Sequence, residues 1–163
     1  MPDDMNVDKA KVVSMTPEYA AMIAQWKYDG VYAFYDHKEE DVGELLDGRH
    51  FACIGASGEL LGFYAFGSDA RVPTVENDVY SEEFLDIGLG LCPDLCGQGL
   101  GTGFILLGLQ YAQVVYQTRA FRLSVAAFNE RAIKVYWRAG FRTEKEVTNS
   151  FYKNKFYVMT CLR

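Results

Sequence analysis

Four glycines alternate with other residues in the stretch Cys96-Gly97-Gln98-Gly99-Leu100-Gly101-Thr102-Gly103. An apolar run typical of a buried strand, 84–91, precedes this stretch, and a run with the pattern of a helix, 104–117, follows it. Glycines at such a junction let the backbone approach a ligand closely. The N–H groups of a helix's first turn have no partner within the helix, so they form an anion site whose usual occupant is a pyrophosphate. The sequence therefore predicts a phosphate-bearing ligand here.

Two common phosphate-binding motifs do not fit this loop. A Walker A loop requires a Lys and a Ser or Thr directly after its last glycine, and no Lys follows these glycines. A dinucleotide fingerprint requires Gly-x-Gly-x-x-Gly and an acidic residue about 20 residues further on. The glycines instead fall at 97, 99, 101 and 103, and the next predicted strand carries Ser124 where the acid is needed. An NTPase and a dinucleotide-binding protein are both disfavoured.

A second block of sequence follows the loop. Asn129, Ala132, Tyr136 and the pair Gly140-Phe141 have the spacing N-x2-A-x3-Y-x3-G-F. Together with the glycine loop, which fits Q/R-x-x-G-x-G/A, this block resembles the GCN5-related N-acetyltransferase (GNAT) family. The resemblance is good over about 84–141, taken as the cofactor-binding core, and loose before residue 50. Cys96 departs from it, because the family usually has Gln or Arg at that position.

The residue pattern predicts one mixed α/β domain over residues 1–163, with the element order β-α-α-β-β-β-α-β-α-β-β. Strands are expected at 11–15, 50–54, 60–66, 84–91, 121–126, 142–147 and 156–162. Helices are expected from Pro17 to about Trp26, in a broken segment over 32–46, and over 104–118 and 130–139. Residues 1–9 are expected to form a loose leader. The resemblance implies a GNAT-like, mostly antiparallel sheet of about six or seven strands, splayed at a bulge in the central strand.

Composition excludes several classes of function. The net charge of −6 and the pI near 4.9 disfavour nucleic acid as a partner, because backbone binding needs many Lys and Arg side chains. No apolar run approaches the roughly 18 residues that span a membrane. Cys92 and Cys96 have no second pair and no nearby His, so no metal site is predicted. Reduced cysteines and the absence of a signal peptide favour a cytoplasmic location.

The resemblance implies that acetyl-CoA is the cofactor and that its acetyl group passes directly to an amine. Backbone N–H groups of Gly97, Gln98, Gly99, Leu100, Gly101 and Thr102 would hold the pyrophosphate. The pantetheine arm would lie along Leu89, Gly90 and Leu91, where an N–H near Leu89 or Gly90 would polarise the thioester carbonyl. Glycine within the strand is typical of a bulge or of a close approach by a ligand. Asn129 is expected to cap the next helix and to contact the cofactor arm.

Tyr136 is the candidate general acid, because a phenol of pKa about 10 can protonate the departing thiolate. The alternative is core packing, since Tyr136 shares a helical face with apolar residues. The general base is the weakest assignment. Asp86, or Glu82 or Glu83 just before it, could take the proton directly or through water, although each could instead be an ordinary charge. A single base need not exist.

The acceptor is predicted from the first third of the chain. Aromatic and acidic residues gather there and would suit a small cationic primary amine: Trp26, Tyr28, Tyr32, Phe34, Tyr35, Asp36, Glu39, Glu40 and Asp41. An amphipathic helix with a solvated charge run is the alternative. A protein or peptide acceptor, at an N-terminus or a lysine, stays open but is disfavoured by Ser124, which stands where relatives that acetylate a ribosomal N-terminus have Glu. A non-catalytic acetyl-CoA-binding regulatory domain is the other class considered, and exposed aromatics could support a homodimer.

Overall fold

The computed structural model describes residues 9–163, so most of the leader predicted over 1–9 lies outside the described residues. Seven strands form one sheet in the order β1-β2-β3-β4-β5-β7-β6. Their bounds are β1 (Lys11–Ser14), β2 (His50–Ile54), β3 (Leu60–Phe66), β4 (Leu85–Leu91), β5 (Ala120–Ala126), β6 (Arg142–Thr148) and β7 (Lys155–Leu162). The pairs β1–β2, β2–β3, β5–β7 and β6–β7 are antiparallel, and β4–β5 is parallel. The predicted α/β class and mostly antiparallel sheet are confirmed.

The helices follow the predicted order. They are α1 (Pro17–Gln25), α2 (Val42–Leu45), α3 (Gly101–Val115) and α4 (Glu130–Arg138), with 3₁₀ turns η3 (Gly30–Tyr35), η4 (Glu39–Asp41), η5 (Ser68–Ala70) and η6 (Pro93–Leu95). The segment predicted as a broken helix is therefore mostly 3₁₀, and α2 is a single short turn. Helix α3 begins at Gly101, three residues earlier than predicted. Gly101 and Gly103 therefore lie within its first turn.

Local caps explain where the helices begin and end. The hydroxyl of Thr16 accepts a hydrogen bond from the Tyr19 N–H at 3.1 Å, and Pro17 occupies the first helical position of α1. At α4, the side chain of Asn129 accepts from the Ala132 N–H at 3.1 Å. Gly140 follows α4 with φ +107°, a conformation that few residues other than glycine adopt. The Asn129 cap agrees with its sequence prediction.

Contacts group the chain into two compact units. The first comprises the chain up to Ala65 together with Leu89–Leu107, and the second comprises Phe66–Gly88 and Gly108–Arg163. Strand β4 and helix α3 each contribute residues to both units.

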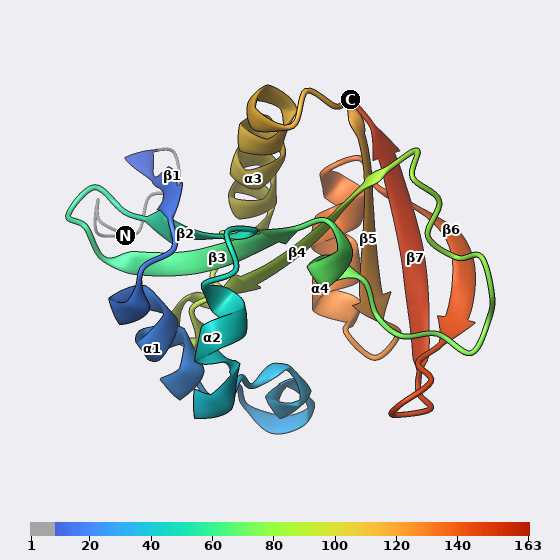
Figure 1. Cartoon of the computed structure of the whole chain (residues 1–163), viewed down its shortest axis with the longest axis horizontal. Helices are drawn as coiled ribbons and strands as arrows, with labels where there is room; N and C mark the ends of the chain where they lie inside the picture. The colour runs from blue at the N-terminus through green and yellow to red at the C-terminus, as the bar shows by residue number, and fades with distance from the viewer. Residues whose placement is uncertain (1–8) are drawn as a thin grey trace. The chain divides into compact units, whose positions relative to one another are not determined.

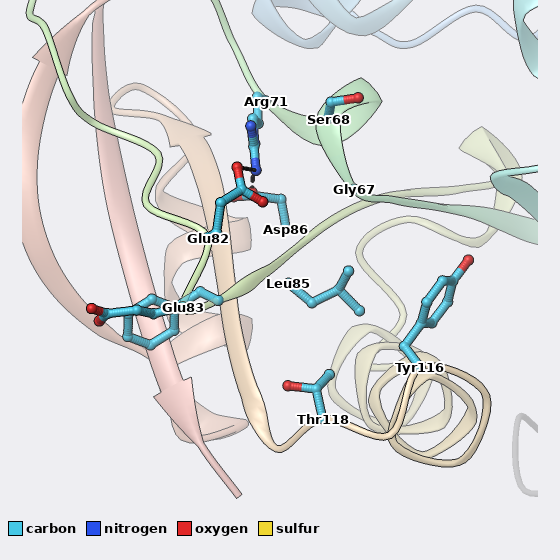
Figure 2. Close-up of a pocket in the computed structure, with 10 residues that line it drawn as sticks. Gly67, Ser68, Arg71, Glu82, Glu83, Leu85, Asp86, Tyr116 and Thr118 are labelled. Atoms are coloured by element: carbon cyan, nitrogen blue, oxygen red, sulfur yellow. Dashed lines mark hydrogen bonds and ion pairs between the residues drawn. The ribbon is translucent and has the colours of Figure 1, made fainter.

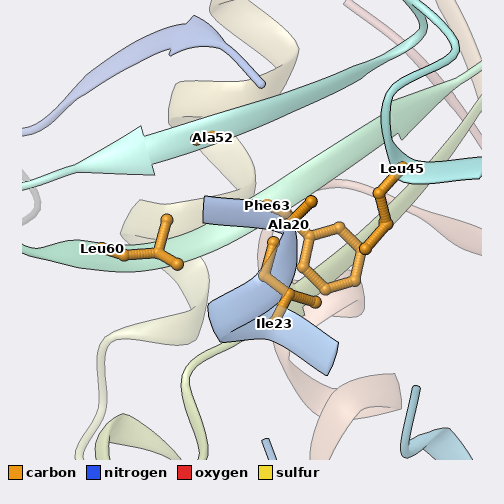
Figure 3. Close-up of a cluster of buried hydrophobic side chains, with 6 residues drawn as sticks. All are labelled: Ala20, Ile23, Leu45, Ala52, Leu60 and Phe63. Atoms are coloured by element: carbon orange, nitrogen blue, oxygen red, sulfur yellow. The ribbon is translucent and has the colours of Figure 1, made fainter. Parts of the chain in front are cut away.

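In the first unit, α1 and α2 cover one face of β2 and β3. Their buried apolar side chains form a cluster with residues of both strands: Ala20, Ile23, Leu45, Ala52, Leu60 and Phe63 (Figure 3). The first turn of α3 packs against the other face of β3. The rings of Tyr64 and Phe104 stack with centroids 4.6 Å apart, and the Tyr64 hydroxyl donates to the Phe104 carbonyl at 2.6 Å. This buried pair fixes the start of α3 against the sheet.

In the second unit, β5, β7 and β6 lie side by side, with continuous pairing between β5 and β7 from Ala120–Leu162 to Ala126–Phe156 (Figure 1). The long segment after β3 is tied to the turn between β6 and β7. A β-bridge joins Thr74 to Asn149, and the Val75 N–H donates to the Thr148 carbonyl at 2.9 Å. Within residues 9–163, no helix is both long and apolar enough to cross a membrane.

Candidate functional site

The glycines of the predicted phosphate loop divide into two kinds. Gly97 and Gly99 have φ of +77° and +78°, which is the left-handed region that glycine adopts without strain. Gly101 and Gly103 lie in the first turn of α3. The first pair therefore turns the chain, and the second pair leaves the start of the helix without bulky side chains.

The start of α3 has the character of an anion site. The Phe104 N–H donates to the Leu100 carbonyl at 3.0 Å, which is a bond of the helix's first turn. The N–H groups of Gly101, Thr102 and Gly103 precede it, and such groups have no acceptor within their own helix. The Gln98 side chain instead turns back, and its Nε2 donates to the Asp94 carbonyl at 2.6 Å. This geometry favours binding by main-chain groups.

The thiol of Cys96 is turned toward the end of β4. Its Sγ lies 3.8 Å from the Leu91 carbonyl oxygen and 3.6 Å from the Cys92 carbonyl oxygen. None of the cysteines in the described part of the chain forms a disulfide. At the position where Gln or Arg was expected, a short side chain therefore contacts the strand end.

The main-chain N–H and C=O groups of Leu89, Gly90 and Leu91, the residues predicted for the pantetheine arm, face alternate edges of β4. The Cys92 N–H donates to the Leu61 carbonyl at 2.8 Å, so Cys92 turns its main chain toward β3. The Gly90 carbonyl also faces β3, because its oxygen would lie 2.6 Å from a Cβ on Gly62. Since successive strand residues direct their N–H and C=O groups to opposite edges, those of Leu89 and Leu91 face away from β3.

The absence of a side chain at Gly90 has a packing cause. A Cβ there would lie 2.7 Å from Cζ of the buried Phe63 ring, and closer still to its Cε1. An aromatic ring of β3 therefore packs closely against this glycine, and the approach of the cofactor arm along Gly90 stays a prediction.

Tyr28, which lies after α1, contacts the end of β4. Its hydroxyl donates to the Leu91 carbonyl at 2.9 Å, and its own N–H donates to Oδ1 of Asp36 at 2.9 Å. Burial and the nearby Cys96, Cys92 and Asp36 raise the pKa of Tyr28, so its hydroxyl stays protonated as a donor. The sequence placed Tyr28 among the aromatics of the acceptor region but gave no sign of this contact.

In the second unit, Tyr136 lies in α4 and Asn129 directly precedes this helix. Asn129 caps the helix, as predicted. Tyr136 is partly exposed, and its ring lies edge-on to the buried Phe141 with centroids 6.3 Å apart. One side of the Tyr136 ring thus packs in the unit, which leaves both of its predicted roles, acid and core residue, open.

Asp86 lies in a buried ionic network. Parallel pairing sets it opposite Arg122, and two hydrogen bonds of 2.7 Å join the carboxylate to Nε and Nη2 of that guanidinium. Nε of Arg71 donates to the same carboxylate at 2.8 Å. The Arg122 Nη2 also donates to the Ser81 carbonyl at 2.9 Å. Each Asp86 oxygen thus accepts from a guanidinium, which favours a structural role over proton abstraction.

A cavity of about 450 Å³ lies beside this network (Figure 2). Arg71 and Asp86 line it together with Glu82 and Glu83, the two other acids considered as bases. Both glutamates are exposed, and Glu82 reaches Nη2 of Arg71 at 3.3 Å. Glu82 and Glu83 are therefore surface charges beside the buried ion pair of Asp86 with its arginines.

Comparison with known families identifies the class of this protein. The chain belongs to the acetyltransferase (GNAT) family, whose profile matches residues 16–141. It is accordingly an N-acetyltransferase, and acetyl-CoA is its acetyl donor. No curated protein sequence matches the chain.

Solved structures share the fold over nearly the whole chain. A GNAT-family acetyltransferase from Bacillus anthracis has a TM-score of 0.74 at 15% identity, with 97% of each chain covered. The aminoglycoside-bound AAC(6')-Ib, in complex with ribostamycin and coenzyme A, has a TM-score of 0.71 at 20% identity, covering 96% of this chain and 94% of that one. A chimera of spermidine N-acetyltransferase SpeG from Vibrio cholerae and hSSAT has a TM-score of 0.71 at 16% identity, covering 94% and 95%.

The first unit fits the donor in two respects. The loop at Gly97 and Gly99 leads into a helix start suited to a pyrophosphate, and the edge of β4 at Leu89 and Leu91 faces away from β3. A strand edge of this kind can pair with the amide groups of a pantetheine arm.

Proposed function

We propose that this acetyltransferase acts on the primary amine of a small cationic molecule. The contact between the Tyr28 hydroxyl and the Leu91 carbonyl supports this proposal, because it joins the acidic segment after α1 to the strand expected to hold the donor. Asp36 of that segment accepts from the Tyr28 N–H, and Glu39, Glu40 and Asp41 follow in η4. Carboxylates and aromatic rings near the thioester would attract an ammonium group.

The names of two similar structures support this proposal. Two of the similar structures are named for spermidine or were solved with an aminoglycoside, and both ligands carry several amines. Ser124 disfavours a role in acetylating a protein N-terminus. The family resemblance implies a catalytic Glu at this position in members with that activity, whereas here a Ser hydroxyl lies 2.8 Å from that of Tyr80.

The donor would be held mainly by main-chain groups. We assign the pyrophosphate to the N–H groups of the loop and first turn, Gly97, Gln98, Gly99, Leu100, Gly101 and Thr102. The arm would pair with Leu89 and Leu91, beside Gly90. Strand alternation favours the Leu89 N–H over that of Gly90 for polarising the thioester carbonyl, because Gly90 turns toward β3. Asn129 would add a contact to the arm through its amide.

Tyr136 is proposed as the acid that protonates the departing thiolate. Its ring packs edge-on against Phe141 and the residue is partly exposed, which suits a well-positioned group that must also contact a ligand. A cytoplasmic location and a homodimer stay predictions from the sequence.

Thiol release from acetyl-CoA tests the proposed function. The purified chain is incubated with acetyl-CoA and, separately, spermidine, an aminoglycoside, a lysine peptide and a peptide with an N-terminal alanine. We expect release with a polyamine or aminoglycoside and little with either peptide. Release with the peptides alone would overturn the small-amine assignment. Tight acetyl-CoA binding without release on any amine would contradict activity itself.

A further inference from the structure

His37 lies next to the part of the sheet where acetyl transfer is proposed. It follows η3 and is one of two histidines in the chain. Its ring meets the Phe63 ring edge-on, with centroids 5.3 Å apart and an interplanar angle of 83°. The Phe63 ring lies directly against Gly90 of β4. The Phe63 ring therefore contacts both His37 and the strand that would hold the acetyl group.

A second set of contacts fixes the His37 backbone near that strand. The residue before it, Asp36, accepts from the Tyr28 N–H at 2.9 Å, and the Tyr28 hydroxyl donates to the Leu91 carbonyl at 2.9 Å. The segment carrying His37 is thus held to β4 at Leu91 by hydrogen bonds and at Gly90 by ring packing. Both contacts lie within the first unit.

We propose that His37 is the general base, accepting the proton that the acceptor amine releases as it attacks the thioester. This proposal rests on the proposed function. The free amine forms the new C–N bond, and its nitrogen then loses a proton to a ring nitrogen of His37. The C–S bond breaks with its electron pair on sulfur, and the thiolate takes a proton from Tyr136. Both side chains then exchange protons with water.

The imidazole is available for this role. It is partly exposed, and among residues 9–163 no hydrogen bond joins either ring nitrogen to another protein group. Burial, aided by the nearby His50, lowers the pKa of His37, whereas Asp41, Glu44 and Asp36 oppose that shift. The ring is therefore neutral at pH 7 and able to accept a proton.

The other candidates for the base are less suited to it. Asp86 accepts hydrogen bonds from two guanidinium groups at 2.7–2.8 Å, whereas His37 has an open ring nitrogen. His50 is buried on β2, and its Nδ1 lies 3.0 Å from Oδ1 of Asp47. Substitution of His50 therefore serves as the matched control, because His50 is a histidine whose ring already contacts Asp47.

The test compares His37→Gln with His50→Gln, using whichever amine supports thiol release by the wild-type protein. At saturating substrates, general-base catalysis predicts a loss in kcat of about 10²-fold or more for His37→Gln. The wild-type kcat should fall on the acid side as His37 is protonated, and that limb should disappear in His37→Gln but persist in His50→Gln. Acetyl-CoA affinity, measured by calorimetry, should be unchanged in His37→Gln.

His37→Ala gives an independent measurement, because added imidazole can restore a missing base but not a missing packing contact. Recovery of thiol release with imidazole is expected. An active wild type whose His37 variants keep its kcat and acid limb would overturn the role of His37 alone, and so would a failure of imidazole to rescue a folded His37→Ala. If the wild type releases no thiol with any amine, the proposed function fails instead.

Discussion

Asp86 and Arg122 face each other on neighbouring parallel strands and form a buried, two-pronged ion pair with both bonds at 2.7 Å. Their side chains are only 1% and 2% exposed. Arg71 adds a third bond to the carboxylate, and the Arg122 guanidinium lies 5.0 Å from the Tyr80 ring centroid. Removing one partner from such a pair leaves the other charge buried and uncompensated.

Asp86→Asn should therefore lower the free energy of unfolding by about 3–5 kcal/mol. Urea unfolding measures this change, with Glu82→Gln as control, because Glu82 is exposed and pairs only at the edge of the network. The control should shift stability by less than about 1 kcal/mol. If Asp86→Asn keeps full stability but loses kcat, Asp86 is a base after all and the structural assignment is wrong.

Gly90→Ala should destabilise the protein through a clash with the Phe63 ring. Overpacking in a well-packed core costs about 1–3 kcal/mol, and thermal unfolding should show the loss. Phe63→Leu in the same chain should recover part of it by making room. Gly43→Ala is the matched control, because no atom lies within 4 Å of a Cβ there. Equal stability of Gly90→Ala and the wild type would show that Phe63 moves aside freely.

Features set by local chemistry were predictable from the sequence. Thr16 and Asn129 cap their helices through side-chain bonds three residues along the chain, and Gly140 ends α4 by its positive φ. Such signals lie within one turn of the element they define. The order of strands and helices followed from them and from apolar periodicity.

The rest depends on contacts distant in sequence. Tyr28 and Leu91 are 63 residues apart, and Asp86 and Arg122 are 36 apart, so only the register of the sheet reveals that they meet. Asp86 on a central strand suggested a base because nothing local indicated its two arginine partners. His37 directly precedes the charged residues 38–41, and its contact with Phe63 could not be inferred from spacing.

Cys96→Arg should strengthen acetyl-CoA binding. The Cys96 thiol contacts the end of β4, so a longer cationic side chain at this loop position could add a charge-assisted hydrogen bond to the pyrophosphate. Such bonds contribute about 1.5–3 kcal/mol, which is roughly 10-fold or more in affinity. Calorimetry with acetyl-CoA measures it, with Cys96→Ala as the uncharged control. Weaker binding by Cys96→Arg would show that the thiol's contacts with Leu91 and Cys92 hold the loop in shape.

Tyr136→Phe should lower kcat by about 10²-fold or more while leaving the affinity for acetyl-CoA within about twofold. The substitution removes only the hydroxyl and keeps the ring that packs against Phe141. Steady-state kinetics and calorimetry on the same preparation separate the two effects. Trp137→Phe, at the neighbouring exposed position, controls for general changes to α4. An unchanged rate in Tyr136→Phe would assign Tyr136 to packing alone.

Stability should depend on pH through His37. Burial lowers the pKa of His37 below its ordinary value of 6.5, so the unfolded chain binds this proton more readily than the folded one. Between the two pKa values the unfolded state carries more protons, and stability therefore rises with pH.

As pH falls through about 6.5, the wild type should lose a part of its free energy of unfolding that His37→Gln retains. Urea unfolding of both proteins from about pH 8 to pH 5 isolates this part, because the other titrating groups are common to both. A difference between the two proteins that stays constant over this range would contradict the lowered pKa of His37.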